Sequence, residues 1–185
     1  MIAIKIISHS DDFTHSIMVK NITDTFSHAI EQKSMGTVEV EDYKVSPNKD
    51  PITFTKSKIK DKEPTLIFLE ANLGYSGKQE VTFLKEFFQE YKDSKFILYS
   101  STKITKKTTS QNLGELLGKD YVDQVTNVIG VLYKPFTMID LRDIVYTEEM
   151  NNWMADNGVG INAEGRGVNK VPTFENKRME DIKLK

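Results

Sequence analysis

The segment Thr65-Leu66-Ile67-Phe68-Leu69-Glu70 decides the fold, and Ala71-Asn72-Leu73-Gly74-Tyr75-Ser76-Gly77 follows it directly. An unbroken run of apolar or β-branched residues predicts a strand that is buried on both faces, as in a parallel sheet. The strand ends at the carboxylate of Glu70, and a turn rich in Gly and Asn leads to a helix that Ser76 and Gln79 can cap. Open α/β sheets place their functional sites at the edge that the carboxyl ends of the strands form, which is where Glu70 is expected. Glu70 is therefore either a site residue or a solvated residue that ends a strand.

Four more segments have the composition of strands, and helical patterns separate them. The strands are expected at 2–7, 38–41, 95–99 and 128–133, in addition to 65–70. Helices are expected from 13 to about 32, from 77 to about 92, at 113–117 before Gly118, and from Thr137 to about Trp153. This order predicts a doubly wound α/β fold with a flavodoxin-like five-stranded parallel sheet, strand order 2-1-3-4-5, and a C-terminal extension.

Composition sets modest bounds on function. The chain has 185 residues, a formal net charge of -2 and no cysteine, so disulfides, thiol catalysis and cysteine-ligated metals are excluded. The first strand begins at Ile2, which is unlike a signal peptide, and no run approaches the roughly 20 apolar residues of a membrane span. We expect a cytoplasmic protein that binds neither nucleic acid nor a membrane.

Residues 44–63 are rich in lysine and predict a loop with at most a short helix. Lys56, Lys58, Lys60 and Lys62 alternate along this segment. They could contact a phosphate backbone or simply form a solvated face. The solvated face is the favoured interpretation, because no aromatic residues interleave with these lysines in the sequence.

Three motifs lie at the carboxyl ends of the predicted strands. They are Leu69-Glu70-Ala71-Asn72-Leu73 with Gly77 further on, Ser100 thirty residues after Glu70, and Lys134-Pro135-Phe136 after the fifth strand. In these motifs and their order, residues 1–148 resemble the receiver domain of two-component response regulators. The resemblance implies that Glu70 occupies the phosphoacceptor position, and that Ser100 and Lys134 match the family's Thr or Ser and its Lys.

The chain also departs from the receiver pattern. Glu70 stands where that family has an aspartate, and Ser8 and His9 stand where it has an acidic pair that binds magnesium. Val131 takes the place of its switch aromatic. Magnesium prefers several hard oxygen ligands, so we expect no metal here. Glu70 can instead reach Lys134 and Ser100, either as a structural strut or as a frozen imitation of the phosphorylated state. Residual phosphorylation is the third possibility.

The histidines suggest no metal or cofactor site. His9, His15 and His28 do not have the i, i+4 spacing of a helical metal pair. His9 could sense pH at the edge of the site, but a surface or capping histidine is the simpler interpretation. Residues 8–14 are similar to a flavodoxin phosphate loop only faintly, because they lack glycine and contain two acids, so we expect no bound FMN.

The predicted domains are a receiver-like domain at 1–150 and a flexible or docking tail at 151–185. The tail is rich in Gly and Asn, yet carries apolar anchors such as Trp153 and Phe174. It could wrap over its own domain, dock on a partner as an extended peptide, or be a disordered terminus.

The function expected from the resemblance is that of a pseudo-receiver: a non-catalytic module for protein–protein interactions in bacterial signal transduction that needs no phosphorylation. Its partner would be another signalling protein or a second copy, bound through the face of helix 4, strand 5 and helix 5 and through the tail. The residues expected to bind partners are Leu116, Tyr146, Trp153 and Phe174. The alternatives are a functional response regulator that accepts phosphate or is locked in an active-like state by Glu70, and an enzyme or cofactor protein on the same fold.

Overall fold

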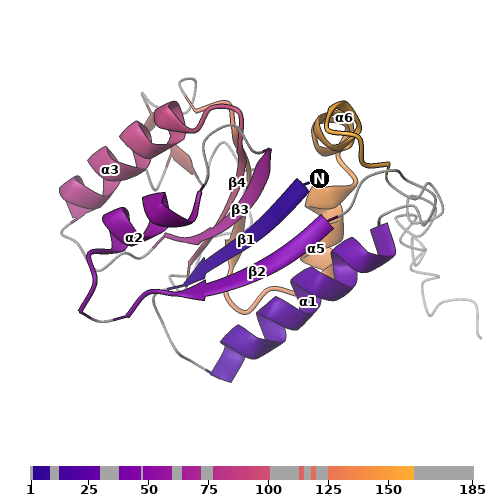
Figure 1. Cartoon of the computed structure of the whole chain (residues 1–185), viewed down its shortest axis with the longest axis horizontal. Helices are drawn as coiled ribbons and strands as arrows, with labels where there is room; N and C mark the ends of the chain where they lie inside the picture. The colour runs from indigo at the N-terminus through magenta and orange to yellow at the C-terminus, as the bar shows by residue number, and fades with distance from the viewer. Residues whose placement is uncertain are drawn as a thin grey trace, which may run out of the picture.

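The computed structural model describes residues 2–8, 13–29, 38–46, 48–59, 64–71, 77–100, 113–114, 118–119 and 125–160. His9, Leu116 and Phe174 lie outside these residues. The helices and strands, labelled as in Figure 1, are β1 (Ile2–Ser8), α1 (Phe13–Ala29), β2 (Val38–Lys44), α2 (Pro51–Lys58), β3 (Thr65–Glu70), α3 (Gly77–Glu90), β4 (Lys95–Ser100), β5 (Val128–Tyr133), α5 (Met138–Val145) and α6 (Glu148–Asp156).

The five strands form one parallel sheet in the order β2-β1-β3-β4-β5. This flavodoxin-like topology confirms the fold predicted from the sequence. Helices α1 and α5 cover one face of the sheet, and α2 and α3 cover the other (Figure 1). Every residue of the central strand β3 is buried, as its unbroken apolar run predicts for a strand covered on both faces.

Strand alternation divides the interior into two cores, because successive side chains point to opposite faces of a sheet. The core on the side of α1, α5 and α6 includes Leu66, Phe68, Ile97 and Tyr99. The core on the side of α3 includes Ile67, Leu69, Phe96 and Leu98. Each side chain at the end of a strand is thereby assigned to one of these two faces.

The last predicted helix is two helices in the structure. As predicted, Thr137 caps α5: its hydroxyl accepts a bond from the amide of Asp140, and the Asp140 carboxylate accepts one from the amide of Thr137 at 2.7 Å. The helix ends at Val145 and does not continue to Trp153. The reason is Thr147, whose hydroxyl accepts a bond from the amide of Met150 at 3.3 Å and so starts α6.

Helix α6 belongs to the folded domain. Met150 and Met154 lie one helical turn apart, and both are fully buried in the core on the α1 side, together with Val159. The boundary predicted at residue 150 therefore falls within α6. The folded domain extends to at least residue 160, and a tail can begin only after it.

Gly130 allows α5 to pack closely on β5. A methyl group added at this glycine would overlap Cδ1 of Ile144 and lie 3.2 Å from its Cγ1. The position requires glycine for space and not for its backbone conformation, because its φ lies outside the left-handed region, although the β4–β5 register shifts just before it.

The lysine-rich segment contains one short helix, as predicted. Helix α2 has eight residues, with Asp50 as its N-cap and Pro51 in its first turn. Gly118 also has the predicted role of ending a helical turn. Its φ is +90°, and its amide donates to the carbonyl of Gly114 at 3.1 Å.

Candidate functional site

The carboxyl ends of β1, β3, β4 and β5 meet at one edge of the sheet, and four of the predicted site residues lie there: Ser8, Glu70, Ser100 and Lys134. Three backbone hydrogen bonds fix this edge, from Val45 to Ser8, from Ala71 to Tyr99 and from Lys134 to Ser100, at 2.8–2.9 Å. All three extend the pairing one residue beyond the end of a strand. The chain is thus held in place where these side chains emerge.

Glu70 and Lys134 form an ion pair inside this edge. The Lys134 Nζ lies 3.3 Å from the Glu70 Oε1, and the two side chains are only 2% and 3% exposed. The contact predicted between the two residues is therefore confirmed. Removing charges from water is costly unless they are paired, so each of these groups depends on the other.

Tyr99 lies beside the ion pair, a role that the sequence did not suggest. It is paired with Glu70 in the β3–β4 register, and its ring centroid is 5.9 Å from the Lys134 Nζ, within range of a cation–π contact. Its hydroxyl donates to the carbonyl of Ile7 at 3.0 Å. The ring therefore crosses from β4 toward β1 on the face to which Glu70 belongs. Its place immediately before Ser100 is the signal that could have identified it.

The segment after β5 is held from two sides. Phe136 stacks with Phe68 and meets Tyr99 edge-on, at centroid distances of 6.5 and 5.9 Å. From α1, the amide of Asn21 donates to the Phe136 carbonyl at 3.1 Å. The Lys134–Pro135 peptide bond is cis. The position of Lys134 is therefore fixed by the packing of Phe136 and by the hydrogen bond from Asn21. No pattern near Asn21 in the sequence indicates this hydrogen bond.

Ser8 and Ser100 share this edge but face different cores. Ser8 lies one step beyond the paired residues Ile7 and Leu69, so it neighbours Glu70. It is fully buried, and its hydroxyl has no hydrogen-bond partner among the described residues. Ser100 is also buried, but alternation along β4 places it on the α3 face, opposite Tyr99. The structure thus brings Glu70, Lys134 and Ser8 to one face, and assigns Ser100 to the other.

This arrangement offers little to a metal ion. Ser8 contributes a neutral hydroxyl where a carboxylate would be needed, and the Glu70 carboxylate is already occupied by an ammonium group. Across the part of the chain that the structure describes, no cluster of three or more histidine or acidic side chains could hold a metal. His15 is instead paired with Asp42, with 3.1 Å from its Nε2 to each carboxylate oxygen. His28 donates to a backbone carbonyl of its own helix.

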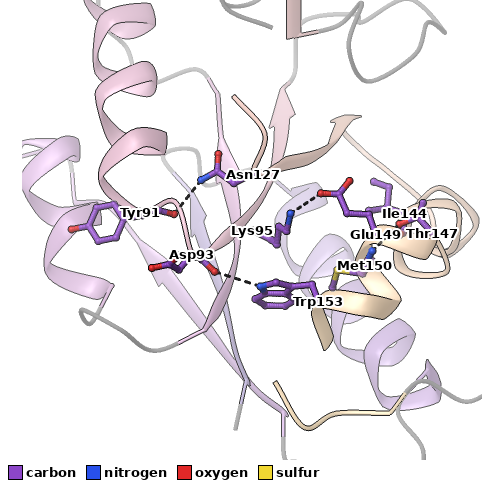
Figure 2. A network of polar contacts seen from close by, with 9 residues as sticks. All are labelled: Tyr91, Asp93, Lys95, Asn127, Ile144, Thr147, Glu149, Met150 and Trp153. Carbon is purple, nitrogen blue, oxygen red and sulfur yellow. Dashed lines mark hydrogen bonds and ion pairs between the residues drawn. The ribbon is translucent and has the colours of Figure 1, made fainter. Parts of the chain in front are cut away.

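Two of the residues expected to bind partners pack on their own domain. Tyr146 and Trp153 are partly buried against the core on the α1 side. The Trp153 indole donates to the Asp93 carbonyl at 3.4 Å, as Figure 2 shows. Trp153 is therefore an internal contact of α6 and not part of a free tail.

A polar network fixes α6 to the opposite, amino edge of the sheet (Figure 2). The Lys95 ammonium lies 2.6 Å from the Glu149 carboxylate. Nearby, the Asn127 side chain donates to the carbonyls of Phe88 and Tyr91 at 2.9 and 3.1 Å, which caps the end of α3. This edge has a structural role, and it lies across the sheet from the Glu70–Lys134 pair.

Two apolar side chains that the sequence reasoning did not select are exposed beside the ends of β5 and α5. Tyr133 is 44% exposed and Ile139 is 68% exposed. Ile139 lies two residues before Leu141, off the buried stripe of α5 that Leu141, Ile144 and Val145 form. An apolar residue off the stripe of an amphipathic helix is a signal that the sequence contained.

No protein-family model matches the chain, and a search of curated proteins finds no match. Among solved structures, the chain is similar to a crystal structure from Burkholderia pseudomallei that is provisionally described as pilus assembly-related. The two are 12% identical in sequence, with a TM-score of 0.48, and the match covers 77% of this chain and 85% of the other. The described helices include none long and apolar enough to cross a membrane.

Proposed function

We propose that the chain is a degenerate receiver-like domain of bacterial signal transduction that binds other proteins without phosphorylation. One observation carries the proposal: the residue at the phosphoacceptor position, Glu70, is buried in an ion pair with Lys134 at 3.3 Å. A carboxylate that is 2% exposed and already neutralised by an ammonium group is poorly placed to attack a phosphoryl donor.

The described residues form no cluster of metal ligands at this edge, which supports the same proposal. Phosphoryl transfer depends on positioning and on charge that stabilises the transferring group, and in this reaction a metal ion supplies most of that charge. Ser8 stands where the resemblance expects an acid, and it contributes no charge. The domain is therefore proposed to be non-catalytic, with the ion pair acting as a strut that links β3 to β5.

Metal binding tests this part of the proposal. Titration of the protein with Mg²⁺, followed by amide NMR, should give no saturable shift below about 1 mM, because one neutralised carboxylate is a weak magnesium site. Saturable shifts around Ser8 and Glu70 at lower concentrations would contradict it.

A second candidate function is a regulator that Glu70 holds in an active-like state. The pairing of Glu70 with Lys134 favours it, because a phosphoryl group at this position would also meet that lysine. The two functions differ in what Glu70→Gln should do. A strut loses stability while the folded fraction still binds its partner, whereas an active-like lock loses partner binding at temperatures where the variant remains folded.

The proposed partner surface is the face of β5 and α5, where Tyr133 and Ile139 are exposed. An exposed apolar side chain can contribute to a contact with another protein. In a pull-down from the native organism, Ile139→Glu should lose a captured protein, or should lower self-association in sedimentation. The matched control is Ile17→Glu, because Ile17 is 44% exposed on α1. Equal capture by both variants would remove this face from the proposal.

Residues 161–185 remain the proposed docking tail, with Phe174 as the anchor. The tail is expected to bind a partner as an extended segment, since Pro172 restricts the backbone next to it. A chain that ends at residue 160 should unfold at the same urea concentration as the full chain but capture less partner. If truncation lowers neither stability nor capture, the tail is not a docking element.

A further inference from the structure

The fold places two aromatic rings close to the lysines at the two ends of α2. Tyr43 comes from β2 and Phe54 from α2, and both rings are partly buried. The Lys58 Nζ lies 4.7 Å from the Tyr43 centroid and 5.2 Å from the Phe54 centroid, and the Lys49 Nζ lies 5.3 Å from the Phe54 centroid. We call Tyr43, Lys49, Phe54 and Lys58 the α2 patch. The sequence favoured a solvated face for the lysines of residues 44–63, because no aromatic residues interleave with them. In the structure, however, Lys49 and Lys58 lie close to aromatic rings.

Both ends of α2 are fixed by polar groups. At its start, the Asp50 carboxylate accepts a bond from the Thr53 amide at 2.8 Å. At its end, the Lys5 side chain, which is only 4% exposed, donates to the Lys58 carbonyl at 2.5 Å and lies 3.1 Å from the Glu41 carboxylate. A helix of eight residues is marginal by itself, so these anchors hold the patch in place. Groups already held in place lose less entropy when a ligand binds.

The cations of the patch are available to an anion. Lys56, the other described lysine of α2, is engaged by Glu90, whose hydrogen bond raises the pKa of Lys56. Lys49 and Lys58, by contrast, have no carboxylate partner within the described ranges of the chain. Their ammonium groups lie close to the half-buried ring of Phe54. The patch therefore combines two cationic positions with one apolar contact.

We propose that the α2 patch binds a short acidic segment of a partner protein. Carboxylates of that segment would meet Lys49 and Lys58, and an apolar side chain between them would pack on Phe54. The inference rests on the proposed function, a module that binds proteins, and adds the chemistry of one partner. Its surface is distinct from the β5–α5 face and from the Glu70–Lys134 pair.

The acids around the patch favour a peptide over a nucleic acid. Asp50 is next to Lys49 in the chain, Glu41 lies beside Tyr43, and Glu90 occupies Lys56. A continuous phosphate backbone would pass these carboxylates, and each would repel it. A short peptide needs only two favourable charge contacts and can place neutral residues elsewhere.

Fluorescence anisotropy with the full chain tests the proposal. The probe is a fluorescein-labelled synthetic peptide that has two leucines flanked on each side by two glutamates. We expect saturable binding below about 1 mM that weakens as salt is raised. The same peptide with glutamine in place of glutamate, and a labelled oligodeoxythymidine, should bind more weakly. Tighter binding of the oligonucleotide would overturn the proposal in favour of single-stranded nucleic acid.

Substitutions of the two lysines test whether the acidic peptide binds at the α2 patch. Lys49→Gln/Lys58→Gln should weaken peptide binding by roughly tenfold, since an exposed ion pair contributes up to about fivefold. The matched control, Lys92→Gln/Lys119→Gln, removes the same charge from exposed positions elsewhere and should change binding less than about twofold. Equal loss in both variants, or no binding at all, would overturn the proposal.

Reversing the charge of both lysines separates a loss of the binding contacts from a general loss of folded protein. Lys49→Glu/Lys58→Glu should release the acidic peptide and bind its counterpart in which lysines replace the glutamates. If this variant remains folded by circular dichroism and binds neither peptide, the proposal fails. The proposed function fails separately, through phosphorylation of Glu70, which has no bearing on the peptide titration.

Discussion

Glu70, the carboxylate at the end of β3, is buried in contact with the opposite charge of Lys134, and this contact determines what its substitution costs. In water, the Glu70 carboxylate and the Lys134 ammonium would attract each other weakly, but here both are almost fully covered. Attraction at low dielectric is strong and the desolvation of each group is costly, so the net benefit of the pair is small. The loss of one partner is a different matter, because the other group stays buried without the opposite charge that it contacts here.

A double-mutant cycle in urea measures this dependence. Glu70→Gln and Lys134→Met should each lower the free energy of unfolding by about 3–5 kcal/mol, because each variant removes the opposite charge from a buried charged group. The double variant should lose less than the sum of the two.

The exposed pair Lys20–Asp24 on α1 is the control for this cycle. Its Lys20→Met variant should cost less than about 1 kcal/mol, as is usual for a surface pair at i, i+4. Strict additivity of the Glu70 and Lys134 substitutions would mean that the two groups do not couple in solution.

The sequence was sufficient to predict the ion pair but not its surroundings. Glu70 and Lys134 end strands of a parallel sheet, and the rules of α/β topology bring such ends to one edge. The contacts of Tyr99 and Asn21 depend on side-chain direction and on how α1 is positioned over the sheet. No local pattern encodes either contact, because their partners lie 92 and 115 residues away in the chain.

Close packing between β5 and α5 makes Gly130 a sensitive position. Gly130→Ala should lower the free energy of unfolding by about 1–3 kcal/mol, since the added methyl group overlaps Cδ1 of Ile144. Ile144→Val removes that carbon atom and should restore part of the loss when the two substitutions are combined. Urea unfolding of the single and double variants checks this, and a double variant that is less stable than the additive value would contradict it.

Helix α6 should contribute to stability as part of the domain. Met154→Ala should lower the free energy of unfolding by about 2–5 kcal/mol, because Met154 is fully buried. Asn152→Ala, at an exposed position of the same helix, should stay within about 0.5 kcal/mol of the unchanged protein. Equal stability of the two variants in urea would show that α6 is not docked in solution.

The boundary of the tail was the element that sequence patterns placed least well. Glycine and asparagine suggested flexible chain from about residue 151, and the helix before it was extended through Tyr146 and Thr147. The spacing of Met150 and Met154 was the available signal, together with the capping threonine ahead of them. In the lysine-rich segment, likewise, the Lys58 ammonium lies close to Tyr43 as well as to Phe54, and its contact with Tyr43 joins α2 to β2.

At the scale of the whole domain, the two edges of the sheet differ: the amino edge holds α6 in place, and the carboxyl edge contains a buried ion pair. At the amino edge, α6 is fixed by Lys95 and by Trp153 (Figure 2). At the carboxyl edge, the charges that a receiver would use for chemistry are matched against each other. Among the described residues, exposed apolar or cationic side chains lie on β5 and α5 and in the α2 patch, and we propose that both surfaces contact other chains.

We propose that Glu70 does not accept phosphate, and intact-mass spectrometry tests this directly. The protein is incubated with acetyl phosphate and Mg²⁺, with the Glu70→Gln variant as the measure of labelling at other positions. We expect the same mass for the protein before and after incubation, because the Glu70 carboxylate is buried, is paired with Lys134 and has no cluster of metal ligands beside it among the described residues. A phosphoryl group that is added to the protein but not to Glu70→Gln would contradict the account.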